Sequence, residues 1–137
     1  MRDSLRISCN RHNLKVVRDF VTNFLEKYSL LELQVNQIVL AVDEVVANLI
    51  IHGNAEDDSK FLTLRVSVID GLFTIEIEDD SPTSYSPATY REPDLQEFIR
   101  QGKKGGVGMT LVNRIMDRVE FTNDDHHNLC RLSKKIG

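Results

Sequence analysis

The sequence predicts an α+β fold, a two-layer α/β sandwich in which helices cover one face of a mostly antiparallel mixed sheet. Three observations support this fold class. The first half of the chain has two segments with apolar residues at helical spacing. An Asp-Gly turn then joins two segments in which apolar and polar residues alternate, and a helix that begins with glycines precedes a final hairpin. The predicted order of elements is β, α, α, β, β, a long loop, α, β, β.

The first 54 residues predict one short strand and two helices. SLRIS at residues 4–8 alternates like a strand, and Asn10 or Asn13 is a candidate cap for an amphipathic helix at 11–28. A second helix is expected from about 32 to 52, with apolar residues at helical spacing. The Gly53-Asn54 pair is a typical helix end.

The middle of the chain predicts a hairpin. FLTLRVSVI at 61–69 and LFTIEIED at 72–79 each alternate with a period of two residues. Asp70-Gly71 joins them, and this dipeptide is the strongest short-range hairpin signal. We therefore expect an antiparallel pair with one buried face.

Residues 80–104 are polar and irregular, with one helical turn expected in LQEFIR. A loop longer than about 15 residues is usually functional or disordered. Beyond it, Gly105-Gly106-Val107-Gly108 opens a helix with apolar residues at core spacing. A last hairpin is expected to pair VEFT with NLCRLSKK.

Length and composition predict one folded domain spanning residues 1–137. The chain is long enough to bury a core, and it contains 41% hydrophobic and 28% charged residues. Its net charge of −4 argues against direct nucleic-acid binding, because no overall basic field would attract phosphates. We expect a protein that does not bind nucleic acid directly.

The cysteines and the hydropathy predict a soluble cytoplasmic protein. Cys9 and Cys130 have no C-x-x-C spacing, and no basic, apolar leader begins the sequence, so reduced thiols are expected. A structural zinc site is not expected. No uninterrupted apolar run reaches the 18 or so residues that a membrane span requires, so any visit to a membrane would need a partner.

The predicted second helix carries a polar pair in apolar surroundings. Glu44 and Asn48 are one turn apart and fall on the side opposite the main core face. Leu40, Ala41, Ala47 and Ile51 surround them, so this side resembles the floor of a pocket more than a solvated surface. A carboxylate and an amide oxygen together suit a general base and a hard cation such as Mg²⁺. Taken alone, a half-exposed and solvated pair is the more common case.

Two further features are compatible with a phosphate ligand. Glycines at a helix start let backbone N–H groups approach a phosphate, and Lys103 and Lys104 add positive charge. Turns also use glycine for conformational reasons alone. Asp79, at a strand end, has the chemistry to accept a hydrogen bond from an exocyclic amine such as that of adenine, although turn aspartates are common.

Together, in this order and spacing, these features resemble the GHKL, or Bergerat-fold, ATP-binding superfamily. The resemblance is to its small branch of bacterial anti-sigma-factor serine/threonine kinases. That branch has a box of form E-x-x-x-N ending near H-G, and E44-V-V-A-N48-L-I-I-H52-G53 matches it. A D-x-G box corresponds to Asp79-Asp80-Ser81, and a G-x-G box corresponds to Gly106-Val107-Gly108. The resemblance covers Arg11 to Lys135.

The resemblance implies a function and a set of roles. Glu44 would be the general base for an attacking serine hydroxyl, Asn48 would bind Mg²⁺, and Asp79 would accept the N6 amine of adenine. Lys103, Lys104, Gly106 and Gly108 would meet the phosphates of ATP from a lid at about 81–105. The implied substrate is an anti-anti-sigma factor, the second partner is a sigma factor, and homodimers are frequent in the family.

One departure leaves an alternative open. Ser81 followed by Pro82 stands where the family has a glycine that lets the backbone approach the base. A catalytically weak or inactive adaptor, which binds a regulatory partner without chemistry, is therefore the competing interpretation. The ATP-binding half of a sensor histidine kinase shares the fold, but the H-G ending resembles the serine-kinase branch more closely.

Overall fold

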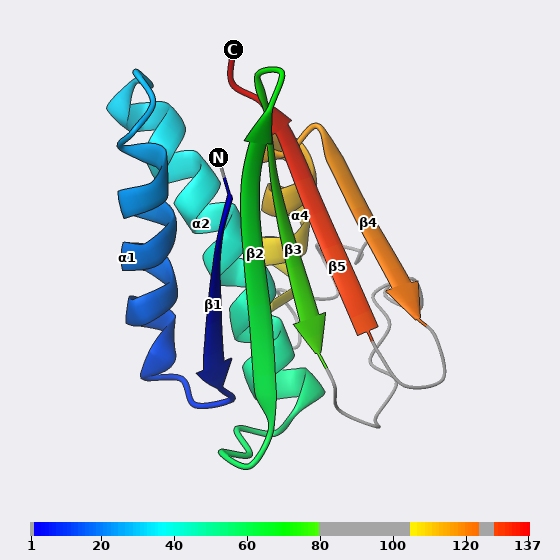
Figure 1. The fold of residues 1–137 in the computed structure, drawn as a ribbon. Coiled ribbons are helices and arrows are strands. Elements are labelled where there is room, and N and C mark those ends of the chain that lie inside the picture. Colours follow the sequence, from blue (N-terminus) through cyan, green and yellow to red (C-terminus); the bar gives the residue numbers. More distant parts are fainter. Residues whose placement is uncertain (1, 80–104, 124–127) are drawn as a thin grey trace.

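The computed structural model describes residues 2–79, 105–123 and 128–137. The predicted turn in LQEFIR, Ser81, and the lid lysines Lys103 and Lys104 lie outside these described residues. Within them, helices cover one face of a five-stranded sheet, which confirms the predicted fold class (Figure 1). All four strand pairings are antiparallel.

The sheet has the strand order β1-β2-β3-β5-β4. Strand β1 spans Arg2–Ser8, and β2 (Phe61–Ile69) and β3 (Leu72–Asp79) form the predicted hairpin. Asp70 and Gly71 have φ values of 52° and 76°, the left-handed pair that a two-residue hairpin turn requires. Strands β4 (Arg118–Asn123) and β5 (Asn128–Lys135) form the last predicted hairpin.

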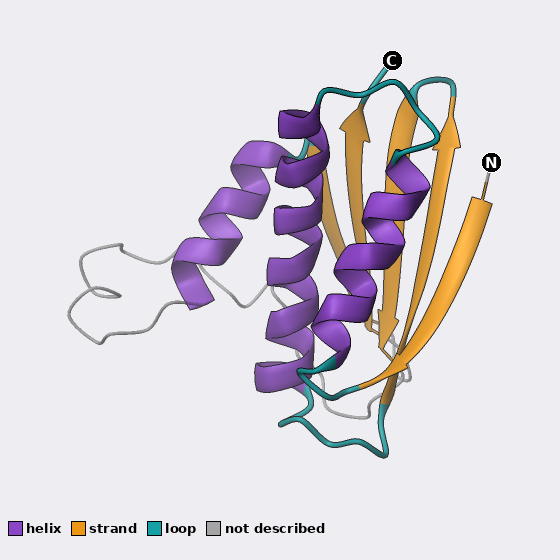
Figure 2. Ribbon diagram, turned by 90° about the vertical axis from the view of Figure 1, so that its left-hand side faces the viewer, coloured by secondary structure: helices purple, strands orange, loops and turns teal. Residues whose placement is uncertain are grey.

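Among the described residues, three helices cover the same face of the sheet (Figure 2). Helix α1 spans Asn13–Leu25, α2 spans Glu32–Asn48 and α4 spans Gly105–Ile115, and α2 packs against both of the others. The predicted caps of α1 are wrong, because the N-cap is His12 and has no side-chain bond. Asn10 instead accepts a hydrogen bond from the His12 N–H at 2.9 Å. Asn13 is itself the first helical residue and cannot be the N-cap, and its amide nitrogen donates to the Ser8 carbonyl at 2.9 Å.

The α2 segment ends differently from the regular helix predicted for 32–52. Its last turn, η1 (Leu49–Gly53), is a π-helix. Short π-helical segments are rare and occur frequently at functional sites. The change of helix type begins directly after Asn48, so it lies at the predicted polar pair.

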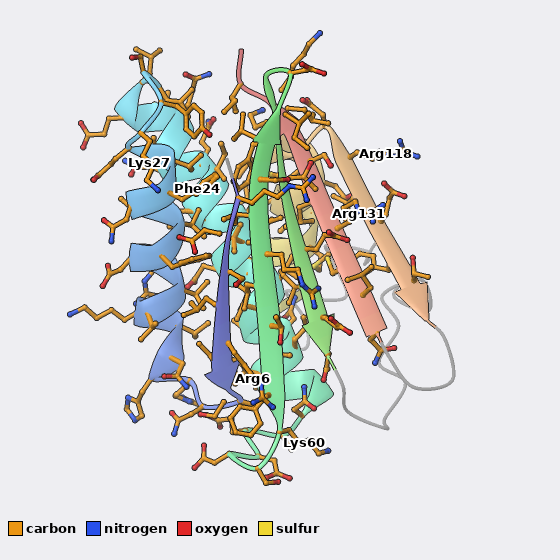
Figure 3. All side chains as sticks on the ribbon, in the orientation of Figure 1. Arg6, Phe24, Lys27, Lys60, Arg118 and Arg131 are labelled. Atoms are coloured by element: carbon orange, nitrogen blue, oxygen red, sulfur yellow. The ribbon has the colours of Figure 1, made fainter. Side chains whose placement is uncertain are left out.

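The core lies between the sheet and the helix layer. Inward-facing residues of β2 and β3 meet the apolar faces of the helices, and Phe24 of α1 packs on Phe73 of β3 with ring centroids 6.2 Å apart. The opposite sheet face is polar. There Arg131 contacts Glu76 at 2.9 Å and Arg118 contacts Glu120 at 3.0 Å (Figure 3).

The helical run Glu32–Ile51 has the length and overall composition of a membrane-crossing helix, with a mean hydropathy of 1.4. Composition alone does not distinguish such a helix from the core helix of a folded protein. Here the run is the middle helix of the layer, and it buries Ile38, Val42 and Val46 completely. Its apolar character is therefore accounted for by this core.

Candidate functional site

The candidate site lies where α2 and β3 end, at the same end of the molecule (Figure 1). Three of the predicted residues, Glu44, Asn48 and Asp79, are described there. The structure also adds a residue that the sequence reasoning used only as a helix stop, Asn54.

Glu44 lies in the middle of α2, half-buried. Burial raises the pKa of its carboxyl group, and the negative charge of Asp43 raises it further. A carboxylate whose pKa lies above the ordinary value is better suited to take a proton near neutral pH. The environment of Glu44 therefore fits the predicted role of a general base.

Asn48 is one turn further along α2 and is only 7% exposed. Its amide nitrogen Nδ2 is buried and has no hydrogen-bond partner among the described residues. An unpaired buried polar group costs on the order of 1–3 kcal/mol, so its presence in a core helix needs an explanation. A ligand that contacts this amide would supply one.

The environment of the pair is more enclosed than the sequence predicted. Ala41 was expected to line the pocket floor beside the pair, but it is fully buried in the core. Helix α4 packs against α2, and a helical wheel of α2 alone cannot include this packing. Leu40 remains 42% exposed, as expected for the outer side of the helix.

Asp79 is the last residue of β3 and is 1% exposed. Its Oδ2 accepts a hydrogen bond of 2.9 Å from Nδ2 of Asn54. The same Nδ2 donates to the carbonyl of Leu49 at 2.8 Å. Asn54 therefore joins the end of the α2 segment to the end of β3, and it brings two of the predicted boxes together.

Cys9 also belongs to this neighbourhood. It is fully buried, and its backbone N–H donates to the carbonyl of Lys60 at 2.9 Å. Burial first, and then the charge of Asp79, raise the pKa of its thiol to about 11. The thiol is therefore neutral at physiological pH and is no candidate nucleophile.

The glycine box is described in part. Gly106 and Gly108 lie in the first turn of α4, where the N–H groups that precede Gly108 have no intrahelical acceptors. This position agrees with the predicted helix start.

Sequence reasoning missed Asn54 and Cys9. The only signal for Asn54 was its place directly after the His-Gly helix end, where asparagine is a common helix terminator. A long-range contact with Asp79, 25 residues away along the chain, has no local signature. Cys9 likewise lacked any spacing that would connect it to a strand end.

The pattern of the family described as histidine kinase-like ATPase domain matches residues 7–134. The chain belongs to this family. The match covers all described elements from the end of β1 to β5, including Glu44, Asn48 and Asp79.

Curated relatives of this family member carry the name anti-sigma F factor. The protein from Clostridium perfringens strain SM101 is 28% identical over 102 residues, which are 74% of this chain and 72% of the relative. The protein from Clostridium botulinum strain Alaska E43 is 31% identical over 90 residues, 61% of this chain and 58% of the relative. The protein from Geobacillus stearothermophilus is 25% identical over 121 residues, 84% and 78% respectively.

Two solved structures share the fold of this histidine kinase-like ATPase domain. One holds the RsbU and RsbW domains of Rv1364c from Mycobacterium tuberculosis, with a TM-score of 0.70 and 13% identity. The match covers 99% of this chain and 32% of that one. The other is the SiaB-SiaC complex from Pseudomonas aeruginosa, with a TM-score of 0.69, 9% identity, and coverage of 96% and 88%.

The donor set near Glu44 and Asn48 is compatible with Mg²⁺. Among the described residues no group of three or more His, Cys, Asp or Glu side chains could hold a metal ion by itself. Mg²⁺ rarely needs such a cage, because it is usually held by one or two oxygen ligands together with the phosphates of a nucleotide. The amide oxygen of Asn48 is a hard ligand of this kind, and it lies on the same helix as Glu44.

Proposed function

We propose that this protein is an ATP-dependent protein serine/threonine kinase that acts as an anti-sigma factor by switching partners. The supporting observation is that one helix places a carboxyl of raised pKa, that of Glu44, one turn from the buried amide of Asn48, whose donor Nδ2 has no hydrogen-bond partner among the described residues. Membership in the ATPase-domain family and the names of the relatives support the nucleotide and the partner class. The whole chain, residues 1–137, would act as a single domain in the cytoplasm.

In this proposal the amide oxygen of Asn48 and the phosphates of ATP would hold Mg²⁺, whose positive charge would offset the negative charge of the transferring group. Asp79 accepts a hydrogen bond from the adenine amine. Lys103 and Lys104, with the first-turn N–H groups of Gly106 and Gly108, contact the phosphates. Positioning and charge stabilisation of this kind account for most of the catalysis in phosphoryl transfer.

Glu44 takes the proton from the serine hydroxyl of the substrate protein. The serine oxygen then bonds to the γ-phosphorus while the bond from that phosphorus to the β–γ bridging oxygen breaks. ADP leaves with the electron pair of that bond, and the serine becomes phosphoserine. The proposed substrate is an anti-anti-sigma factor, and the sigma factor is bound while that antagonist is phosphorylated.

The first experiment is a calorimetric titration of ATP, with and without Mg²⁺, into the wild-type protein and into Asn48→Ala. We expect Mg²⁺-dependent binding that the substitution weakens by about tenfold or more. Asn36→Ala, at an exposed position of the same helix, is the matched control and should bind like the wild type. Equal affinity in Asn48→Ala and the wild type would contradict the role of Asn48.

The second experiment measures phosphate transfer from γ-labelled ATP to purified candidate antagonist proteins of the source organism. Glu44→Gln should bind ATP but lose transfer by a factor on the order of 10² or more. Transfer that persists in this variant would refute the base assignment.

A specific observation supports a second candidate, the adaptor without chemistry. Ser81-Pro82 replaces the glycine of the adenine box. If a folded protein produced no binding heat at millimolar ATP, the adaptor would replace the kinase as the proposed function.

A further inference from the structure

Asn54 has a position that the proposed roles of Glu44, Asn48 and Asp79 do not explain. It is a polar residue, 2% exposed, between η1 and β2. One nitrogen of its side chain, Nδ2, donates both to the carbonyl of Leu49 and to Oδ2 of Asp79. A neutral side chain with two N–H groups suits both acceptors at once.

The turn that carries Asn54 is strained and held from several sides. Ala55 and Glu56, the next two residues, have φ values of 48° and 56°, a left-handed conformation that is unfavourable for residues other than glycine. The N–H of Glu56 donates to the carbonyl of Ile50 at 2.8 Å. The carboxylate of Glu56 accepts bonds of 2.6 and 3.0 Å from Arg11. Strain that the surroundings over-determine in this way clusters at functional sites.

The amide of Asn54 is also incompletely satisfied. Its Oδ1 is buried and has no hydrogen-bond partner among the described residues. A residue selected only for stability would avoid an unpaired buried acceptor. The unsatisfied oxygen therefore indicates that the two donated bonds serve more than packing.

The hydrogen bond that Asn54 donates to Asp79 orients a charged acceptor. A carboxylate can accept about four hydrogen bonds, and the bond from Asn54 fixes the direction of one oxygen. With Oδ2 held, the orientation of the whole carboxylate is set. An aspartate at position 54 would repel Asp79, and an apolar residue would remove this hydrogen bond from Oδ2.

We propose that Asn54 is a positioning residue for purine recognition. It orients Asp79 toward the exocyclic amine of the base and, through Leu49, ties this orientation to the π-helical end of the helix that carries Asn48. The ligand class is a purine nucleotide whose six-membered ring carries an exocyclic amine where adenine has its N6 amine. This inference rests on the proposed function, specifically on Asp79 as the acceptor for adenine.

The test is a cycle that combines protein variants with two ligands. Dissociation constants are measured for ATP and for purine riboside triphosphate, which lacks the exocyclic amine. The wild type should prefer ATP by about tenfold or more, as expected for a hydrogen bond to a charged group. In Asn54→Ala this preference should fall below about threefold, while affinity for purine riboside triphosphate stays nearly unchanged.

Two further variants keep the test informative. Asn54→Ser replaces Asn54→Ala if that variant does not fold. Its shorter side chain has a single hydroxyl proton and cannot donate to both Leu49 and Asp79, so the same loss of preference is expected. Arg11→Met removes the ion pair that holds the turn but leaves the bond from Asn54 to Asp79 intact, so it should keep the preference of the wild type. An equal loss in Arg11→Met would overturn the inference, because the effect would then come from a loosened turn.

The outcomes separate this inference from the proposed function. If the wild type prefers ATP and the Asn54 variants prefer it equally, the positioning role is overturned while the assignment of Asp79 stands. If the wild type binds both ligands equally, the assignment of Asp79 fails and the inference fails with it. If neither ligand binds, the proposed nucleotide function fails as a whole.

Discussion

Asp43 accepts a hydrogen bond of 2.9 Å from Nη1 of Arg18, which links α2 to α1 one residue before Glu44. The negative charge of Asp43 contributes to the raised pKa of Glu44, after the larger effect of burial. The neighbour of the proposed base therefore affects the pH at which that base loses its proton.

The first prediction concerns Asp43→Asn. The substitution removes a negative charge beside Glu44, so the pKa of Glu44 should fall toward its ordinary value. Because the base must be deprotonated to act, the acidic limb of the pH profile of kcat/KM should move to lower pH. Phosphate transfer measured across the acidic range checks the direction.

Arg18→Met is the matched control for this prediction. It breaks the same ion pair but leaves the charge of Asp43 in place, so the acidic limb should not move to lower pH. The pair is partly exposed, and its loss should cost at most about 1 kcal/mol of stability. A shift to lower pH in both variants would show that the ion pair, and not the charge, determines the profile.

The second prediction concerns the stability cost of Glu44. The pKa of Glu44 is higher in the folded protein than in the unfolded chain. The contribution of this carboxyl group to the free energy of unfolding is therefore fully present below the pKa of the unfolded chain, and it is lost as pH rises through the pKa of the folded protein. At pH 7 the buried carboxylate is thus unfavourable. Glu44→Gln should raise Tm at pH 7, and the gain should shrink near pH 4, as thermal unfolding at both pH values would show.

Asn36→Ala removes no ionisable group, so the change in Tm that it causes should be the same at both pH values. If Glu44→Gln lowered Tm at pH 7, burial would not be disfavouring the charged form of this carboxyl. Taken with the transfer assay, a gain in stability and a loss of activity in one variant would identify a site where stability is given up for function.

The third prediction compares two neighbours in β3. Phe73 is fully buried and packs on Phe24, whereas Leu72 is 41% exposed. Phe73→Ala should lower the free energy of unfolding by about 3–5 kcal/mol, because it leaves a cavity between α1 and the sheet. Leu72→Ala should change it by roughly 0.5 kcal/mol or less. Urea unfolding of both variants measures these two changes. Equal losses of unfolding free energy would contradict the assignment of Phe73, and not Leu72, to the core.

Local sequence patterns were sufficient for most of the fold. The alternation of 61–69 and 72–79, with Asp70-Gly71 between them, predicted a hairpin that the structure confirms. Its signal is local, because turn chemistry and one buried face fix the register. The glycines before Met109 likewise marked the start of α4.

The parts that sequence could not supply depend on distant contacts. The π-helical turn after Asn48 and the bond from Asn54 to Asp79 bring together groups that are not neighbours along the chain. The burial of Ala41 reflects the packing of α2 against its neighbouring helices, which a helical wheel of α2 alone does not include. Residue types and spacing named Glu44, Asn48 and Asp79 as candidates, but only the fold revealed Asn54 beside Asp79.

The last prediction uses the two cysteines as reporters of this end of the molecule. Burial and Asp79 raise the pKa of Cys9 to about 11, and burial alone raises the pKa of Cys130 far above its usual range. At pH 8 roughly 0.1% of Cys9 would be thiolate, the reactive form. Iodoacetamide should therefore label neither thiol in the native protein and both in urea, as mass spectrometry would show.

Asp79→Asn connects this measurement to the candidate site. It removes the second largest cause of the raised pKa of Cys9, so labelling of Cys9 at pH 8 should become faster while labelling of Cys130 does not. Cys130 serves as the internal control for general loosening of the fold. Faster labelling of both thiols would mean that Asp79 maintains the packing of the whole domain, whereas a change confined to Cys9 would show that its charge acts locally at the end of β3.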